Sequence, residues 1–269
     1  MPTLTTPNTG IEIFYEDRGS PDAEVILLVM GLGAQMTLWP DELVAALVGD
    51  GFRVIRYDNR DIGLSQKFEG ARAPSLPVQV LRKKIGFPAK VPYTLKDMAD
   101  DGIGLLDALG IARAHIVGAS MGGMIAQLMA VHHGHRLASL TSIMSTTGNG
   151  KLPQAEKHAI DALVAPIQSM EEESLVAHGL NIVKNIGSPG FPFDPDQQRE
   201  KVLKNVRRSV YPAGPPRQLA AIIDDGCRRA RLAPGARGYG ERGSATGRAS
   251  ANTAIPITPT LSGRPVRAA

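Results

Sequence analysis

Short apolar runs recur along the first half of the chain, separated by turns and by segments with helical spacing. Ile11, Ile13 and Tyr15 alternate with Glu12, Phe14 and Glu16. With the Asn8-Thr9-Gly10 turn before them, this predicts an antiparallel β-hairpin with strands near 3–7 and 11–17. The next run, residues 25–30, is continuously apolar, as is typical of a strand covered on both faces in a parallel sheet. Further strands are expected at 52–57, 115–117 and 140–145.

Segments with helical signals lie between these strands. An apolar helical face at residues 43–47 ends at the glycine-rich turn 49–51. Thr94-Leu-Lys-Asp97 resembles a capping box at the start of a second helix, and Gly110 marks its end. A third helix is expected over 120–132. The alternation of strands and helices predicts an α/β fold with a doubly wound, mostly parallel sheet.

The pattern divides the chain into three regions. Residues 1–149 carry the strand–helix alternation, interrupted by a long Pro-, Gly- and Lys-rich excursion at 66–93, and form the expected core. Residues 150–226 show helical patterns and no clear strand, which predicts a helical cap insertion followed by a return to the core. Residues 227–269 form an aberrant tail. The expected cap helices lie at 159–170, 174–186 and 195–210.

The tail lacks the composition of a packed segment. Of the 37 residues from 233 to 269, 23 are Ala, Gly, Arg or Pro, and no periodicity survives. Such a segment buries too little apolar surface to offset its ordering entropy, so we expect it to be disordered and the last strands of the sheet to be missing. The strand at 140–145 would then be an uncovered sheet edge. Two origins fit this composition, a shifted reading frame or a genuine C-terminus.

The charge distribution and the composition limit the kinds of partner that this chain is expected to bind. The net charge is +4, but residues 228–269 carry eight Arg and one Glu, so residues 1–227 are net negative. A basic tail with one aromatic residue, Tyr239, is a poor nucleic-acid binding set, and no nucleic-acid partner is expected. The single cysteine, Cys227, excludes an internal disulfide. The chain shows no signal peptide and no apolar stretch able to span a bilayer, which predicts a soluble, cytoplasmic protein without a membrane partner.

The candidate chemistry lies at residues 118–122, which read Gly-Ala-Ser-Met-Gly. This G-x-S-x-G pattern stands between an expected strand and an expected helix, where a sharp turn raises the hydroxyl of Ser120 above the sheet. Gly118 and Gly122 supply the small neighbours that such a turn requires. The Met121 N–H, at the helix N-terminus, is placed to donate to an oxyanion. The alternative is a glycine-bearing helix start with no chemistry.

A second oxyanion donor is expected from the loop Met30-Gly31-Leu32-Gly33. Gly31 lets the backbone turn inward, so that the Leu32 N–H faces the same oxyanion as the Met121 N–H. A dinucleotide-binding loop is disfavoured because Met36 stands where its third glycine belongs. A formal match at 238–243 has neither a strand before it nor a helix after it. We therefore expect no cofactor and no metal.

These motifs resemble the α/β-hydrolase superfamily, and within it the esterase branch that includes aclacinomycin methylesterase. The resemblance rests on the loop 30–33, the segment 56–65 (Arg-Tyr-Asp-Asn-Arg-Asp-Ile-Gly-Leu-Ser) and the elbow 118–123, and it extends to about residue 231. It implies that Ser120 attacks a small-molecule carboxylic ester through an acyl-enzyme. It also implies that Asp58 and Arg60 brace the active-site loop; the alternative is a solvated ion pair at the end of a strand.

The resemblance implies a catalytic acid and a histidine beyond residue 231, and neither is present. The last Asp is Asp225 and the last His is His178. A serine hydroxyl without a base is a weak nucleophile, so strong impairment is expected unless His158 or His178 of the insertion supplies the base. Alternatives are a non-catalytic relative that binds a ligand or partner, a carbon–carbon bond hydrolase and a cofactor-free haloperoxidase. The sequence fixes neither the substrate nor the oligomeric state.

Overall fold

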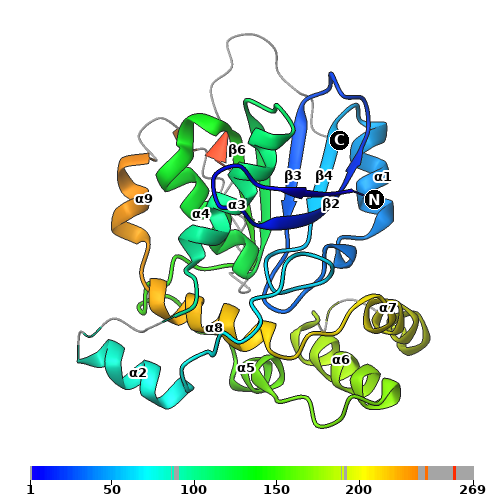
Figure 1. The fold of residues 1–269 in the computed structure, drawn as a ribbon, viewed down its shortest axis with the longest axis vertical. Helices are drawn as coiled ribbons and strands as arrows, with labels where there is room; N and C mark the ends of the chain where they lie inside the picture. Colours follow the sequence, from blue (N-terminus) through cyan, green and yellow to red (C-terminus); the bar gives the residue numbers. More distant parts are fainter. Residues whose placement is uncertain are drawn as a thin grey trace.

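The protein folds around one mixed β-sheet, seen in a computed structural model that describes residues 2–85, 87, 91–188, 190, 193–235, 240–241 and 257–258 (Figure 1). Its strand order is β1-β2-β4-β3-β5-β6-β8-β7. The strands are β1 (Thr3–Thr5), β2 (Glu12–Arg18), β3 (Val25–Val29), β4 (Arg53–Tyr57), β5 (Ala114–Ala119), β6 (Leu137–Ile143), β7 (Gly240–Glu241) and β8 (Ile257–Thr258).

The centre of the sheet is parallel and its edges are antiparallel. Strands β4, β3, β5 and β6 run parallel, whereas β1 and β2 form the expected antiparallel hairpin and β2 joins β4. All five residues of β3 are buried, as a continuous apolar run in a strand covered on both faces requires. The fold is therefore the doubly wound α/β fold that the pattern predicts.

Helices cover both faces of this sheet. They are α1 (Asp41–Gly49), α2 (Leu76–Lys84), α3 (Leu95–Ala108), α4 (Met121–His133), α5 (Lys157–Val164), α6 (Glu172–Ile186), α7 (Pro195–Arg208), α8 (Gly214–Asp225) and α9 (Arg229–Gly235), with short 3₁₀ turns η1 (Met36–Leu38) and η2 (Gly134–Arg136). Successive side chains of β3 point to opposite faces of the sheet. Leu27 and Val29 pack in the larger core with α3 and α4, and Ile26 and Leu28 pack in a smaller one with α1.

The start and end signals of α3 are confirmed. The Thr94 hydroxyl accepts the Asp97 N–H at 3.2 Å, and the Asp97 carboxylate accepts the Thr94 N–H at 2.7 Å, which completes a capping box. Gly110 follows the helix with a φ of 68°, a conformation that glycine adopts readily. These two local signals fix the bounds of a helix whose inner face lies in the larger core.

Helices α5, α6 and α7 lie together at one end of the molecule, below the sheet in Figure 1. They occupy the region in which a helical insertion is expected, and no strand is assigned to the described residues between 150 and 226. The first of them, α5, ends at Val164 rather than near 170. Two ion pairs, Arg207–Glu172 and Arg199–Glu173, join α7 to α6.

The excursion at 66–93 contains an unexpected helix, α2. Its one buried described side chain is polar: Gln79 is 1 % exposed and donates to the Ala220 carbonyl of α8. Apolar neighbours such as Val78 and Leu81 are about half exposed. Because α2 buries a polar residue and exposes apolar ones, it lacks the buried apolar stripe that is typical of surface helices.

The expectation for the tail is wrong at its beginning. The chain continues after residue 227 into α9, and Arg228 is only 1 % exposed. Its guanidinium pairs with Asp225, donates to Gln127 at 3.0 Å and to the Thr146 carbonyl at 2.8 Å. A buried cation satisfied by several acceptors holds this segment against α4 and the end of β6.

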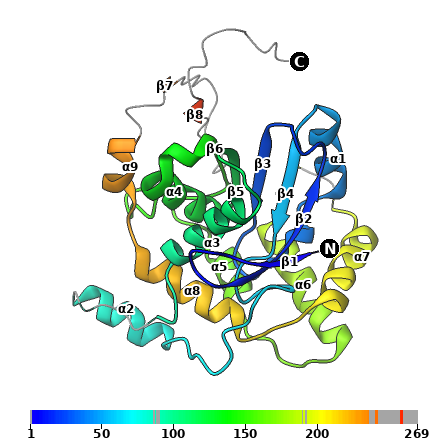
Figure 2. The same ribbon diagram turned by 45° about the horizontal axis from the view of Figure 1, so that its top comes forward.

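Two short strands also lie where no strand is expected. Ile257 of β8 pairs with Leu140 of β6, and β7 pairs with β8 (Figure 2). Strand β6 is therefore covered at one position and is not a wholly bare edge. The expected disorder of the rest of the tail falls on 236–239, 242–256 and 259–269, which lie outside the described residues. None of the described helices is long and apolar enough to cross a membrane.

Candidate functional site

The elbow and the loop after β3 meet because of the sheet register. Strands β3 and β5 are parallel neighbours, and Val29 lies opposite Gly118. The chain therefore leaves both strands at the same edge, one through Met30 and Gly31, the other through Ala119 and Ser120. If Gly31 carried a Cβ atom, it would lie 3.1 Å from the Ser120 Cβ. Segments about 90 residues apart in sequence are thus in direct contact.

Ser120 stands on a sharp turn between β5 and α4. Its φ of 55° and ψ of −119° are rare for a residue with a side chain. The surrounding backbone holds this conformation: the Ser120 N–H donates to the Ile143 carbonyl at 2.9 Å, and the Ser145 hydroxyl donates to the Ser120 carbonyl at 2.8 Å. Among the described residues nothing hydrogen-bonds to the Ser120 hydroxyl, which is half-buried and does not cap α4.

The flanking glycines are required by close backbone contacts. A Cβ on Gly118 would lie 2.2 Å from the Gly122 carbonyl oxygen, and one on Gly122 would lie 2.1 Å from the Val29 carbonyl oxygen. Both separations are far inside van der Waals contact. The sharp turn that the sequence pattern predicts is therefore formed, and it requires glycine at these two positions because a Cβ atom would collide with the backbone.

Two backbone N–H groups flank Ser120 without acceptors. Within the described part of the chain, neither the Leu32 N–H nor the Met121 N–H has a hydrogen-bond partner. Leu32 follows Gly31 in the loop that touches Ser120, and Met121 is the first residue of α4. Free N–H groups at a helix N-terminus and in an adjacent loop are suited to binding an anion.

Asp58 holds the same loop from the end of β4. Its side chain is fully buried, and one oxygen accepts the Met36 N–H at 2.8 Å. The other accepts the Leu64 N–H at 2.9 Å and the Arg208 guanidinium at 2.7 Å. Both oxygens of the Asp58 carboxylate therefore accept hydrogen bonds from other parts of the chain. These bonds join the end of β4 to Met36, Leu64 and Arg208.

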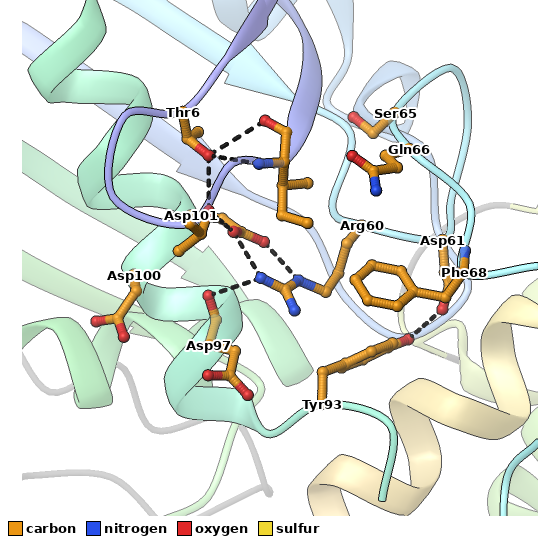
Figure 3. A network of polar contacts seen from close by, with 12 residues as sticks. Thr6, Arg60, Asp61, Ser65, Gln66, Phe68, Tyr93, Asp97, Asp100 and Asp101 are labelled. Carbon is orange, nitrogen blue, oxygen red and sulfur yellow. Dashed lines mark hydrogen bonds and ion pairs between the residues drawn. The ribbon is translucent and has the colours of Figure 1, made fainter. Parts of the chain in front are cut away.

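Arg60 points toward Asp101 of α3 (Figure 3). Its guanidinium forms a two-bond ion pair with Asp101, each bond 2.6 Å long, and lies 5.2 Å from the ring centroids of both Phe68 and Tyr93. Both charged groups are buried, and burial raises the pKa of Asp101 above its ordinary value although Arg60 opposes this. The pair ties the segment after β4 to α3.

Asp61 joins the same segment to α8, a role that the sequence does not reveal. It receives two hydrogen bonds from Arg217, at 2.8 and 2.7 Å, and one from the Tyr93 hydroxyl at 2.7 Å. Burial alone would raise the pKa of Asp61, but these bonds and the Phe68 N–H outweigh it, and the pKa is lowered. Its φ of 71° marks a tight turn. Partners 156 positions apart carry no local sequence signal.

Replacing Asp61 by Asn is expected to cost about 3–5 kcal/mol of unfolding free energy at pH 7, because it leaves the Arg217 cation buried without its counter-charge. The lowered pKa means that the ionised form stabilises the fold above about pH 4 and that this contribution is lost as pH falls through the folded-state pKa. The melting temperatures of wild type and Asp61→Asn should therefore converge below pH 4.

The matched control is Glu173→Gln, which breaks an exposed ion pair with Arg199 and should cost no more than about 1 kcal/mol. Thermal melts of the three proteins between pH 3 and pH 7 make the comparison. A constant gap between wild type and Asp61→Asn over this range would contradict the assignment.

The histidines near the elbow in sequence lie far from it in the fold. His115 is the second residue of β5, which ends one residue before Ser120, so the two are separated by roughly 16 Å along the strand. His133 ends α4, roughly 18–20 Å from Ser120, and bonds to Asp100 at 2.8 Å. His132 and His135 belong to the same end of α4 and the turn that follows.

The two insertion histidines are not joined to the elbow either. His158 is exposed at the start of α5, 3.4 Å from Glu156, and His178 is half-buried on α6. In the described structure no histidine hydrogen-bonds to Ser120. The described residues also contain no group of three His, Cys, Asp or Glu side chains placed to hold a metal ion.

The sequence family described as the alpha/beta hydrolase fold matches residues 24–169, more than half of the chain and the whole of the β3-to-β6 unit that carries the elbow. The chain belongs to the α/β hydrolase family. It is thereby a member of a family of hydrolases, and the resemblance inferred from the loop, the β4 segment and the elbow is confirmed.

Relatives and solved structures agree with this assignment. Rhodomycin D methylesterase DnrP of Streptomyces peucetius is 29 % identical over 224 residues, which cover 76 % of this chain and 68 % of that protein. A hydrolase from Pseudomonas aeruginosa superposes with a TM-score of 0.58 at 25 % identity, covering 87 % of this chain and 76 % of the other. The enol-lactonase from Burkholderia xenovorans gives 0.56 at 25 %, covering 87 % and 77 %.

Proposed function

We propose that this chain is a serine hydrolase by ancestry, which forms an acyl-enzyme on Ser120 with a carboxylic ester of a small apolar molecule, and that its turnover is strongly impaired. The observation that carries the proposal is the elbow: a strained Ser120 whose hydroxyl is free, in contact with a loop that presents an unpaired N–H. Asp58 and Arg60 support this arrangement and take no part in bond making.

The site supplies the nucleophile and the oxyanion donors of the acylation step, and solvent takes up the serine proton. The Ser120 Oγ attacks the ester carbonyl carbon, and the carbonyl oxygen becomes an oxyanion that the Leu32 and Met121 N–H groups stabilise. The tetrahedral intermediate collapses with loss of the alkoxide, which takes up a proton. Water then hydrolyses the acyl-enzyme, releasing the carboxylic acid and restoring the hydroxyl.

The impairment follows from the proton balance of this step. The proton on Ser120 Oγ must pass to a base, and in the described structure no imidazole or carboxylate contacts that hydroxyl. Solvent is then the acceptor, which makes the attack slow. The name of DnrP makes methyl esters the first class of natural ester to test on this chain.

Trapping the acyl-enzyme tests the proposal. Incubation with p-nitrophenyl acetate, acid quenching and peptide mapping by mass spectrometry should place one acetyl group on the peptide that contains Ser120. The adduct should accumulate, because the missing base slows deacylation as well.

Ser120→Ala should lose this adduct, whereas Ser188→Ala, which changes an exposed serine outside the elbow, should keep it. Equal acetylation of wild type and Ser120→Ala would remove Ser120 as the nucleophile and with it the proposed function.

A further inference from the structure

The last turn of α7 is bonded directly to the loop that faces Ser120. The Arg208 Nη1 donates to the Gln35 side chain, and its Nη2 donates to Asp58 at 2.7 Å. Arg208 keeps 15 % of its side chain exposed, whereas Asp58 is completely buried. Arg208 of α7 therefore provides the counter-charge for the buried Asp58 carboxylate at the end of β4.

Gln35 makes the second connection. Its Nε2 donates to the Asn205 carbonyl at 2.7 Å and to the Ser209 carbonyl at 2.9 Å, so it binds two carbonyls at the end of α7. The Thr37 hydroxyl bonds to the Asn205 side chain. Two side chains of the loop are thus fitted to one helix end, and Gln35 is almost fully buried.

Asp58 passes the contact on to the loop backbone. The oxygen that does not meet Arg208 accepts the Met36 N–H at 2.8 Å. A guanidinium, a buried carboxylate and a backbone N–H thereby form a continuous hydrogen-bonded chain from α7 to the loop. Four residues before Met36 lies Leu32, whose N–H is free, and Gly31 touches Ser120.

We propose that Arg208 is a positioning residue that holds the loop 31–36 against Ser120, so that correct seating of α7 sets the position of the Leu32 N–H. This inference rests on the proposed function. Arg208 touches neither the nucleophile nor the oxyanion and acts through Asp58 and Gln35. Displacement of the end of α7 would then move the Leu32 N–H away from the oxyanion.

A second anchor limits the expected effect of losing Arg208. The Gly33 N–H donates to Gln218 of α8 at 2.9 Å, and Gln218 in turn donates to the Arg60 carbonyl at 3.0 Å. Removal of a whole oxyanion donor costs roughly 10²–10³ in kcat. With Gln218 still in place we expect a smaller loss, about tenfold in kcat, with KM changed less than about threefold, because the defect concerns transition-state binding.

The experiment compares Arg208→Met with Arg207→Met. Arg207 is the preceding residue on α7, but it pairs with Glu172 of α6 and does not meet the loop. The readouts are Ser120-dependent p-nitrophenol release from p-nitrophenyl acetate, corrected with Ser120→Ala, and acrylamide quenching of Trp39. Trp39 is the single tryptophan, is 6 % exposed, and its backbone N–H donates to the Met36 carbonyl at 3.1 Å.

Arg208→Met should lower kcat about tenfold and raise the quenching constant at least about twofold, while Arg207→Met matches wild type in both. Arg208→Lys, which keeps the charge and loses the planar fork, should fall between them. If Arg208→Met does not fold, Arg208→Lys decides on the same two measurements. Unchanged kcat and quenching, or equal changes in Arg207→Met, would overturn the proposal.

The two readouts separate this inference from the proposed function. Turnover that is insensitive to Ser120→Ala would remove the proposed function. The quenching of Trp39 would still report whether Arg208 holds the loop, because it needs no chemistry at Ser120.

Discussion

Gly122→Ala is expected to remove most or all of the stability of the fold. A Cβ on Gly122 would lie 2.1 Å from the carbonyl oxygen of Val29 and 2.8 Å from that of Met30. Both are backbone atoms at the end of β3, which is hydrogen-bonded to β4 on one side and β5 on the other. Because neither side of β3 can move without breaking a ladder, the added methyl group must displace the start of α4.

That displacement should lower the free energy of unfolding by more than about 4 kcal/mol, a loss typical of severe core disruption. Domains of this kind have unfolding free energies of about 5–15 kcal/mol, so the variant should be marginally folded or unfolded at 25 °C. Urea unfolding followed by circular dichroism and by Trp39 fluorescence measures the loss.

Gly49→Ala is the matched control. Gly49 is the last residue of α1, a Cβ there meets nothing within 4 Å, and its φ is not positive. The same chemical change should be neutral or stabilising by about 0.5–1 kcal/mol, since Ala favours helix more than Gly. An unfolding midpoint for Gly122→Ala equal to that of wild type would mean that the elbow is not packed against β3 as described.

The parts of the site that could be predicted from sequence are those with short-range signals. The apolar run of β3 and the glycine-bracketed Ser120 each follow from a few adjacent residues, and the capping box sets the start of α3 in the same way. Parallel pairing of β3 with β5 then brings the Gly31 loop to Ser120 without any further information.

The remaining features depend on distant partners. Nothing near Asp61 indicates that Arg217 satisfies it, and nothing near Gln35 indicates that it caps the end of α7. Arg228 is the opposite case. It stands at the start of a segment rich in Ala, Gly, Arg and Pro, which suggests solvent exposure, but it is buried and its guanidinium donates to Gln127 and to the Thr146 carbonyl. Polar networks of this kind are specified by the assembled fold and not by local pattern.

The purified protein is expected to hydrolyse p-nitrophenyl acetate at no more than a trace rate. Loss of the base from a serine–histidine pair costs about 10⁶ in kcat and leaves roughly 10³–10⁴ over water from the oxyanion site and binding. The part of this rate that passes through the acyl-enzyme should be lost in Ser120→Ala, whereas the part due to the oxyanion site and binding should remain. Initial-rate measurements of p-nitrophenol release with enzyme concentrations near the substrate concentration make such slow turnover measurable.

Added imidazole should restore part of the lost rate. A positioned general base contributes roughly 10²–10⁴-fold, and a diffusible one recovers a fraction of this if it can reach the free, half-buried hydroxyl of Ser120. Imidazole also attacks p-nitrophenyl acetate directly, so Ser120→Ala measured at each imidazole concentration gives the background. Rescue above that background, rising with the neutral form of imidazole near pH 7, is the expected result.

The opposite outcome has an equally definite meaning. Turnover at ordinary esterase rates, abolished by Ser120→Ala, would require a base from within the chain, and the insertion supplies two histidines, His158 and His178. His178→Ala and His158→Ala would then identify it, with His132→Ala as the control because His132 lies at the far end of α4. In the described structure neither imidazole is hydrogen-bonded to Ser120, and His158 is exposed and lies 3.4 Å from Glu156. Activity that needs one of these residues would therefore mean that the 150–226 region rearranges to bring an imidazole to Ser120 during catalysis.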